Sequence, residues 1–239
     1  MASGKSLLLS LRNVRETIAT STSTVLDTVR GTITKEACDV RLEQWASRVV
    51  ANSEMMISVH GRENVDPKTT YLVMSNHQSH YDVAVIYYTL GSRIRMVARQ
   101  ELFSVPLFGS AMRAAGFISV DRGNSASAIA RLADARRALH EGTPIWIAPE
   151  GTRSPTGELL PFKKGGFVLA VETGTPVLPV SIAGTREVLR AKGMLSRPGV
   201  EVFVTIHPPV DPKRWADKDP KAARDALSSE VRASIASGL

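Results

Sequence analysis

The stretch YLVMSNHQSHYD, residues 71–82, places an apolar run directly before a polar segment that holds two histidines and a carboxylate. His77 and Asp82 are five residues apart, so on a regular helix their side chains would point roughly 140° away from each other. They can meet if the chain leaves a strand, turns, and starts a helix near Ser79. The stretch therefore predicts a strand–turn–helix unit in which a base and the carboxylate that orients it lie together.

Two other interpretations of this segment are open at the level of pattern. Residues 79–82 also fit a helix capping box, in which Asp82 accepts a hydrogen bond from a backbone N–H of the first turn. A metal site could use His77, His80 and Asp82, but no further cluster of histidine, cysteine or carboxylate residues completes a recognisable ligand set. We therefore expect no metal.

Short apolar, β-rich runs alternate with helical periodicity from residue 69 onward. This alternation is typical of a mostly parallel central sheet flanked by helices, an α/β fold. The expected strands are 71–74, 94–98, 117–120, 145–148, 177–182 and 202–206. The expected helices are 81–90, 106–115, 125–141, 166–173 and 220–237.

The first part of the chain has a different pattern. Residues from about 6 to 56 carry apolar side chains at helical spacing, which predicts an amphipathic pair of helices. Their stripes could attach the protein to an anionic membrane surface, with Trp45 at the interface, or could simply pack on the main domain. We expect residues 1–57 to form this membrane-surface unit and residues 58–239 to form the second domain.

Composition narrows the classes of partner. The formal charge is +7, which favours nucleic acid, anionic lipid or a phosphorylated small molecule. Aromatic residues are only 5% and show no recurring basic–aromatic pattern, so nucleic acid is not expected. The single cysteine, Cys38, excludes an internal disulfide. No run is long and apolar enough for a membrane-spanning helix, so we expect a peripheral or monotopic protein on the cytoplasmic face.

Polar residues follow several of the expected strands. These segments are 76–82, 121–122, 150–154 and 183–186. In open α/β sheets, ligands bind at loops beyond the carboxyl ends of the strands. If the strands are parallel, the first three segments share one edge of the sheet. A histidine, a carboxylate and several arginines would then line one cleft.

Four blocks of the sequence, in order, resemble the sequence blocks of the glycerolipid acyltransferase family. Residues 77–82 match its HxxxxD motif, GFISVDR at 116–122 its second block, PEGTRS at 149–154 its third, and VLPVSI at 177–182 its fourth. The segment FKKGG, 162–166, is also similar to the stretch after the third block. The resemblance spans roughly residues 58–209 and rests on ordered blocks at compatible spacing.

The resemblance implies transfer of a fatty acyl group from acyl-CoA or acyl carrier protein to the free hydroxyl of 1-acylglycerol 3-phosphate, giving phosphatidic acid. His77 would be the general base and Asp82 would fix its tautomer. No cofactor, metal or covalent enzyme intermediate is needed. Substrate phosphate would be bound by Arg122, Gly151, Thr152, Arg153 and Lys163, with Glu150 orienting an arginine or the glycerol hydroxyl.

Alternatives remain within and outside the enzyme class. The acceptor could instead be glycerol 3-phosphate, another lysophospholipid or a lyso-ornithine lipid. The chain could also be a non-catalytic lipid-binding module on the same fold, although the presence of both His77 and Asp82 argues against that. Residues 83–90 and 102–108 supply apolar surface suited to the acyl chain, although we expect most of these residues to pack in the core.

Overall fold

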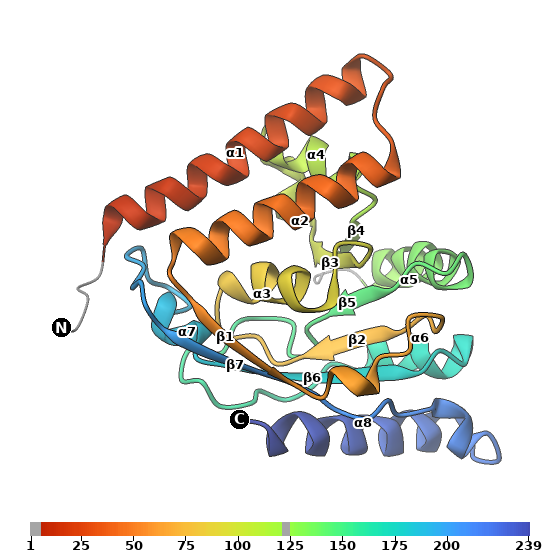
Figure 1. Ribbon diagram of the computed structural model, residues 1–239. Coiled ribbons are helices and arrows are strands. Elements are labelled where there is room, and N and C mark those ends of the chain that lie inside the picture. Colours follow the sequence, from red (N-terminus) through yellow and green to blue (C-terminus); the bar gives the residue numbers. More distant parts are fainter. Residues whose placement is uncertain (1–5, 121–124) are drawn as a thin grey trace.

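A mostly parallel sheet forms the centre of the molecule (Figure 1). The structure is a computed structural model that describes residues 6–120 and 125–239. Within these ranges the spatial order of the strands is β1-β7-β6-β2-β5-β3-β4. All neighbouring pairs are parallel except β6 and β7, which are antiparallel. The strands are β1 (Met56–His60), β2 (Leu72–Ser75), β3 (Arg95–Arg99), β4 (Ile118–Val120), β5 (Ile145–Ile147), β6 (Val177–Ala183) and β7 (Glu201–Ile206).

Helices cover both faces of this sheet. They are α1 (Leu7–Val29), α2 (Lys35–Asn52), α3 (Tyr81–Leu90), α4 (Phe108–Ala114), α5 (Ser125–His140), α6 (Gly165–Thr173), α7 (Thr185–Val188) and α8 (Pro220–Ser237). Three short 3₁₀ turns are η1 (Arg62–Asn64), η2 (Gln100–Ser104) and η3 (Pro212–Trp215). In Figure 1, α3, α2 and α1 are stacked above the sheet, α8 lies below it, and α5 and α6 are at the right.

Each face of the sheet has its own apolar core. Val73 of β2 points into one core, with residues of α2 and α3, while Leu72 and Met74 point into the other, with residues of α6 and α8. This alternation follows from the two-residue period of a strand. It also explains why β2 reads as a continuous apolar run, since both of its faces are covered.

The predicted fold class is confirmed: the sheet is mostly parallel, is flanked by helices and is preceded by a helical pair. Helices α3 and α8 have the predicted bounds. The prediction of helix up to residue 56 was wrong, because α2 ends at Asn52 and Met56 begins β1. The chain reverses at Glu54, whose φ of 51° lies in the left-handed region. The alternating sequence of residues 56–60 then pairs in parallel with β7.

The two amino-terminal helices differ in how far their apolar side chains are buried, and attachment to a membrane surface stays a prediction. Helix α2 buries Ala46 and Val49 in the same core as α3. Helix α1 instead exposes most of its large apolar side chains: Leu7, Leu8, Leu11, Val14, Ile18, Leu26 and Val29. The division of the chain at residue 57 therefore stays a prediction, and one apolar core extends across that position.

Polar contacts fasten α1 to the rest of the protein. Arg48 of α2 forms an ion pair with Glu16 of α1, and Arg41 forms another with Asp27. Arg41 and Arg48 thus join the two helices. Deeper in the molecule, the side chain of Asn13 donates hydrogen bonds to the hydroxyls of Ser53 and Tyr81, both at 2.9 Å.

The hydroxyl of Tyr81 donates in turn to Ser196, also at 2.9 Å. All three side chains are buried, and Tyr81 is the first residue of α3. This cluster of Asn13, Tyr81 and Ser196 therefore connects the outermost helix directly to the start of the helix that carries Asp82.

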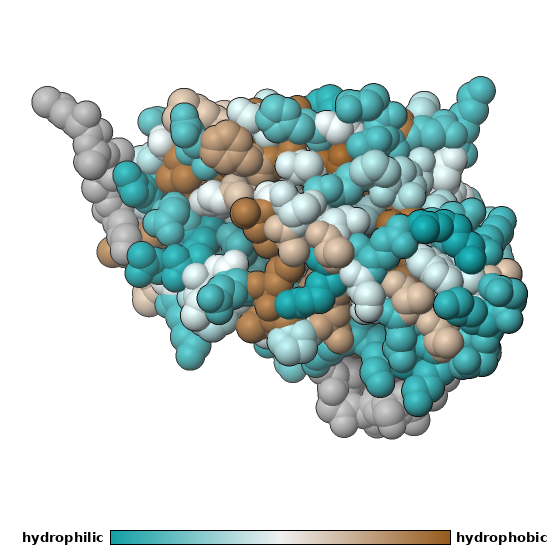
Figure 2. All heavy atoms as spheres, turned by 90° about the horizontal axis from the view of Figure 1, so that it is seen from below, coloured by the Kyte–Doolittle hydropathy of each residue, from teal (hydrophilic) through white to brown (hydrophobic). Residues whose placement is uncertain are grey.

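The surface is not uniformly polar. Seen from the side on which α8 lies, hydrophobic residues gather near the middle and towards the left, which is the direction in which β2 and β5 point (Figure 2). Hydrophilic residues cover most of the right-hand part. Among the described residues, no helix combines the length and the apolar character needed to cross a bilayer.

Candidate active site

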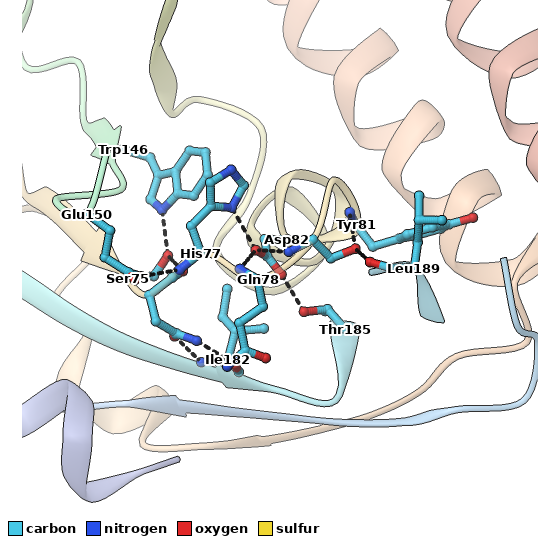
Figure 3. Close-up of polar contacts among 12 residues, drawn as sticks. Ser75, His77, Gln78, Tyr81, Asp82, Trp146, Glu150, Ile182, Thr185 and Leu189 are labelled. Atoms are coloured by element: carbon cyan, nitrogen blue, oxygen red, sulfur yellow. Dashed lines mark hydrogen bonds and ion pairs between the residues drawn. The ribbon is translucent and has the colours of Figure 1, made fainter. Parts of the chain in front are cut away.

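His77 and Asp82 are brought into direct contact by the turn between β2 and α3 (Figure 3). Their side chains approach to 2.7 Å, from His77 Nδ1 to Asp82 Oδ2. Strand β2 ends at Ser75 and α3 begins at Tyr81, so the intervening segment is neither strand nor helix. This is the geometry that the strand–turn–helix prediction requires.

Asp82 also satisfies the capping interpretation. Its Oδ2 atom accepts hydrogen bonds from the backbone N–H groups of Gln78, at 2.7 Å, and Ser79, at 2.9 Å. The Asp82 side chain is 1% exposed. The carboxylate therefore closes the first turn and holds the imidazole at once, and these two roles are not alternatives here.

The His77 ring is held in a defined orientation. Trp146 of β5 stands beside it at 5.8 Å between ring centroids, with the two planes at 89°. The Trp146 indole N–H donates to the Ser75 hydroxyl at 2.9 Å, which fixes the indole. Since Nδ1–H donates to Asp82, Nε2 carries the lone pair of the neutral ring. The arrangement can therefore accept a proton from a hydroxyl group at Nε2.

Both backbone polar groups of His77 are bonded to the loop after β5. Its N–H donates to Glu150 Oε1, and its carbonyl oxygen accepts the Ser154 N–H, both at 2.7 Å. One residue earlier, the Asn76 amide exchanges two hydrogen bonds of 2.8 Å with the backbone of Ile182. The turn is thus fixed by β5 on one side and by β6 on the other.

Glu150 is a buried carboxyl whose observed contacts are with backbone amides. Its second oxygen accepts a hydrogen bond from the N–H of Leu160 at 2.8 Å. The Glu150 side chain therefore connects His77 with Leu160, a later residue of the loop after β5. Burial raises the pKa of Glu150, and the amides of Leu160 and His77 partly oppose that rise. Its expected action on an arginine or a substrate hydroxyl stays a prediction; the contact seen is one that positions His77.

Cations gather at this edge of the sheet. Burial lowers the pKa of Arg153, and the nearby positive charge of Arg99 lowers it further. Arg99 is the last residue of β3 and so lies at the carboxyl end of a parallel strand, where ligands bind in open α/β sheets. The sequence analysis did not identify it as a candidate. Arg122, which was expected to bind phosphate, lies outside the described residues.

Lys163 and Gly151 are packed together, while Thr152 beside them is exposed. A Cβ atom on Gly151 would lie only 2.8 Å from Lys163 Cε, so the lysine side chain runs across the glycine. The Gly151 N–H donates to the carbonyl oxygen of Ala148 at 3.0 Å. The Gly151 N–H is thus bonded within the turn in this structure, and its expected contact with a phosphate stays a prediction.

An apolar cavity of about 280 Å³ lies under the amino-terminal helices and reaches the first turn of α3. Val83, Tyr87 and Phe108, from the two segments expected to contact an acyl chain, line part of it. The remaining wall comes from α1, α2 and the end of α4, and includes Thr17, Ser21, Thr24, Cys38, Leu42, Trp45 and Met112. His80 lies at this cavity and close to Arg153.

Within the part of the chain that the structure describes, no group of three or more histidine, cysteine or acidic residues is placed to hold a metal ion. His80 does not bond Asp82 in the way that His77 does; it precedes the first helical residue and its side chain makes no capping hydrogen bond. The observed polar contacts therefore pair Asp82 with His77.

The known proteins that this chain resembles are acyltransferases. Residues 56–183 match the family model described as Acyltransferase. A 1-acyl-sn-glycerol-3-phosphate acyltransferase of Borreliella burgdorferi is 29% identical over 87% of this chain and 78% of its own length. The human 1-acyl-sn-glycerol-3-phosphate acyltransferase alpha is 32% identical over 72% of this chain and 60% of its own length. An algal relative from Chlamydomonas reinhardtii is also 32% identical, and this chain spans 53% of it.

A solved structure resembles this fold over almost its full length. The crystal structure of the 1-acyl-sn-glycerophosphate (LPA) acyltransferase PlsC from Thermotoga maritima superposes with a TM-score of 0.75. The match covers 95% of this chain and 94% of that one, at 28% sequence identity. The similarity therefore includes the amino-terminal helices as well as the sheet.

Replacing Gly151 with alanine should lower the free energy of unfolding by about 1–2 kcal/mol, because its φ of 72° is unfavourable for a residue with a Cβ atom. The new methyl group would also displace Lys163. Gly165→Ala is the matched control, since a Cβ there meets nothing within 4 Å. Denaturant unfolding of both variants checks this; equal stability of the two would contradict the described turn.

Proposed function

The chain belongs to the Acyltransferase family, and we propose that it transfers a fatty acyl group from a thioester to the free hydroxyl of 1-acyl-sn-glycerol 3-phosphate. The product is phosphatidic acid, so the reaction is a step of phospholipid biosynthesis. The enzyme is an O-acyltransferase, as its relatives of that name are.

The observation that carries the mechanism is the hydrogen bond of 2.7 Å between His77 Nδ1 and Asp82. It leaves Nε2 to take the proton of the acceptor hydroxyl as the oxygen attacks the thioester carbonyl carbon. Asp82 stabilises the imidazolium that results. Substrate hydroxyl takes the place that a serine has in a hydrolase triad, so no acyl-enzyme forms.

Collapse of the tetrahedral intermediate completes the transfer. The carbon–sulfur bond breaks, the carbonyl re-forms as an ester, and the leaving thiolate receives the proton held on His77. The base thus returns to its neutral state. Acyl-CoA and acyl carrier protein both present such a thioester, and the reaction needs no further cofactor.

The substrate phosphate lies among the cations at the carboxyl ends of β3 and β5. Arg153 supplies a guanidinium that binds phosphate oxygens bidentately, and Lys163 supplies a point charge. Arg99 supports this placement, because its charge already acts on Arg153. A dianionic phosphate offsets the repulsion between these like charges, and Arg122 is proposed to join them.

The apolar cavity accommodates a hydrocarbon chain. It is lined by side chains of α3, such as Val83 and Tyr87, and of α4, and it reaches the turn that carries His77. Burial of methylene groups in such a cavity is favourable by about 0.8 kcal/mol each. Two acyl chains are present in the reaction, one on the donor and one on the acceptor. Acceptors other than lysophosphatidate differ in the head group that they present to Arg153.

The protein attaches to a membrane surface through α1. The support for this is the apolar stripe on its outer face, flanked by the exposed Arg12 and Arg15. Apolar side chains at this spacing bury in the headgroup region of a bilayer, and arginines interact with anionic lipids. A lysophospholipid acceptor resides in that layer, so attachment brings the site to its substrate.

His77→Ala should reduce acyl transfer by about 10²–10⁴-fold or more, because a positioned general base is lost. The measurement is turnover of purified protein with acyl-CoA and lysophosphatidate, with unfolding followed in parallel. His140→Ala is the control, since His140 is exposed at the end of α5 and belongs to neither the proposed site nor the cavity. Near-normal turnover of the His77 variant would exclude this mechanism.

Arg153→Ala should raise the KM for lysophosphatidate by roughly 10–100-fold, as expected from loss of a charge-assisted contact of about 1.5–3 kcal/mol. Arg190→Ala, at an exposed position after α7, should leave that KM unchanged. If the acceptor dependence of the two variants were the same, the phosphate would have to bind elsewhere.

Ile18→Asp should weaken binding to anionic vesicles, because it places a charge in the exposed apolar stripe of α1. Met56→Asp makes the same change at an exposed position on β1 and should bind as the unmodified protein does. Point substitutions suit this test better than deletion of the two helices, because deletion also removes core residues of α2. Vesicle sedimentation at fixed lipid composition gives the result, and equal binding of both variants would argue against attachment through α1.

A further inference from the structure

We propose that Thr185 is a positioning residue of this active site, whose hydroxyl fixes the Asp82 carboxylate in the orientation that holds His77. The inference rests on the proposed function and adds a residue from a third segment of the chain. Thr185 is the first residue of α7, immediately beyond the end of β6.

The contact between the two side chains is direct and buried. Thr185 Oγ1 donates to Asp82 Oδ1 at 2.5 Å, and the two side chains face each other in Figure 3. Thr185 is 0% exposed and Asp82 is 1% exposed. The other carboxylate oxygen, Oδ2, receives the donors described above, including His77 Nδ1. Within the described residues, Thr185 is the donor recorded at Oδ1.

The fold places this threonine where it is needed. Gly184, with φ at 96°, turns the chain sharply after β6, and a Cβ atom there would lie 2.2 Å from the carbonyl oxygen of Glu201. Helix α7 therefore starts against the first turn of α3. A second bond joins the segments next to these helices: the Ser79 hydroxyl, in the turn before α3, donates to the carbonyl oxygen of Leu189, directly after α7, at 2.7 Å.

The consequence is orientational. A carboxylate can rotate about its Cβ–Cγ bond, and donors at one oxygen restrain that rotation less than donors at both. Without the Thr185 hydroxyl, Asp82 Oδ1 would lose the donor that it has among the described residues and would be a buried, unsatisfied acceptor. This loss favours rotation of the carboxylate or entry of a water molecule. Either change misdirects the His77 ring. Thr185 acts through Asp82 and does not itself need to touch substrate.

The test compares Thr185→Val, which keeps the side-chain shape and removes the hydroxyl, with Thr185→Ser, which keeps the hydroxyl. Thr185→Val should lower kcat by about 10–100-fold while both substrate KM values stay within about twofold, because geometry of the base changes and substrate contacts do not. Thr185→Ser should recover most of kcat. The matched control is Thr89→Val, which removes another buried hydroxyl, one bonded to a carbonyl oxygen inside α3.

A second measurement does not depend on turnover. In proton NMR of the unliganded protein, the His77 Nδ1–H that bridges to Asp82 should give a downfield resonance, assigned by its loss in His77→Ala. This resonance should shift or broaden in Thr185→Val and be retained in Thr185→Ser and Thr89→Val. An unchanged resonance in Thr185→Val, or unchanged kcat, or failure of serine to restore either, would overturn the proposal.

The two measurements separate this inference from the proposed function. If the unmodified protein fails to acylate lysophosphatidate, the proposed substrate is wrong, and the NMR comparison still decides the role of Thr185. If the unmodified protein is active and Thr185→Val behaves identically, only the positioning role is wrong.

Discussion

The buried carboxylate of Asp82 is the group on which the organisation of this protein depends. It accepts hydrogen bonds from His77, from the amides of Gln78 and Ser79, and from Thr185. A carboxylate this far from water needs donors for both oxygens, because burying an unpaired charge is strongly unfavourable. Those donors come from the turn after β2 and from the segment after β6. The same hydrogen bonds to Asp82 therefore stabilise the turn and orient the His77 base.

The local sequence pattern predicted an element well where both faces of a strand are buried or where a helix has clear start and stop residues. The strand predicted at 71–74 matches β2 to within one residue, because both faces of β2 are covered and its sequence is continuously apolar. Helix α8 has clear bounds because Asp219 caps it and Pro220 occupies its first position. Strand β1 was missed because three of its five residues are exposed and it follows a helix closely, so its pattern resembled the end of that helix.

The sequence predicted only the part of the candidate site whose contacts join residues close together in the chain. His77 and Asp82 are close in sequence, so their contact follows from one turn, whereas the contacts of Glu150 and Thr185 with that turn depend on how three strands are ordered. The segment 183–186 was recognised as a polar segment after an expected strand, but it was not placed at the edge shared by the other three. The Thr185 hydroxyl could not be paired with Asp82 without the strand order β6-β2-β5. Likewise, the bond between the Gly151 amide and Ala148 is a property of the folded turn alone.

The pairing of β1 with β7 has a consequence for how the chain is made. Met56 pairs with Glu201, so the strand that follows the amino-terminal helices finds its partner only when most of the protein has been synthesised. At typical rates of translation the delay is on the order of ten seconds. During that interval the apolar side of α2 has no completed sheet edge beside it, and α1 already displays its stripe. A nascent chain in this state therefore keeps part of its apolar surface exposed until β7 has been synthesised.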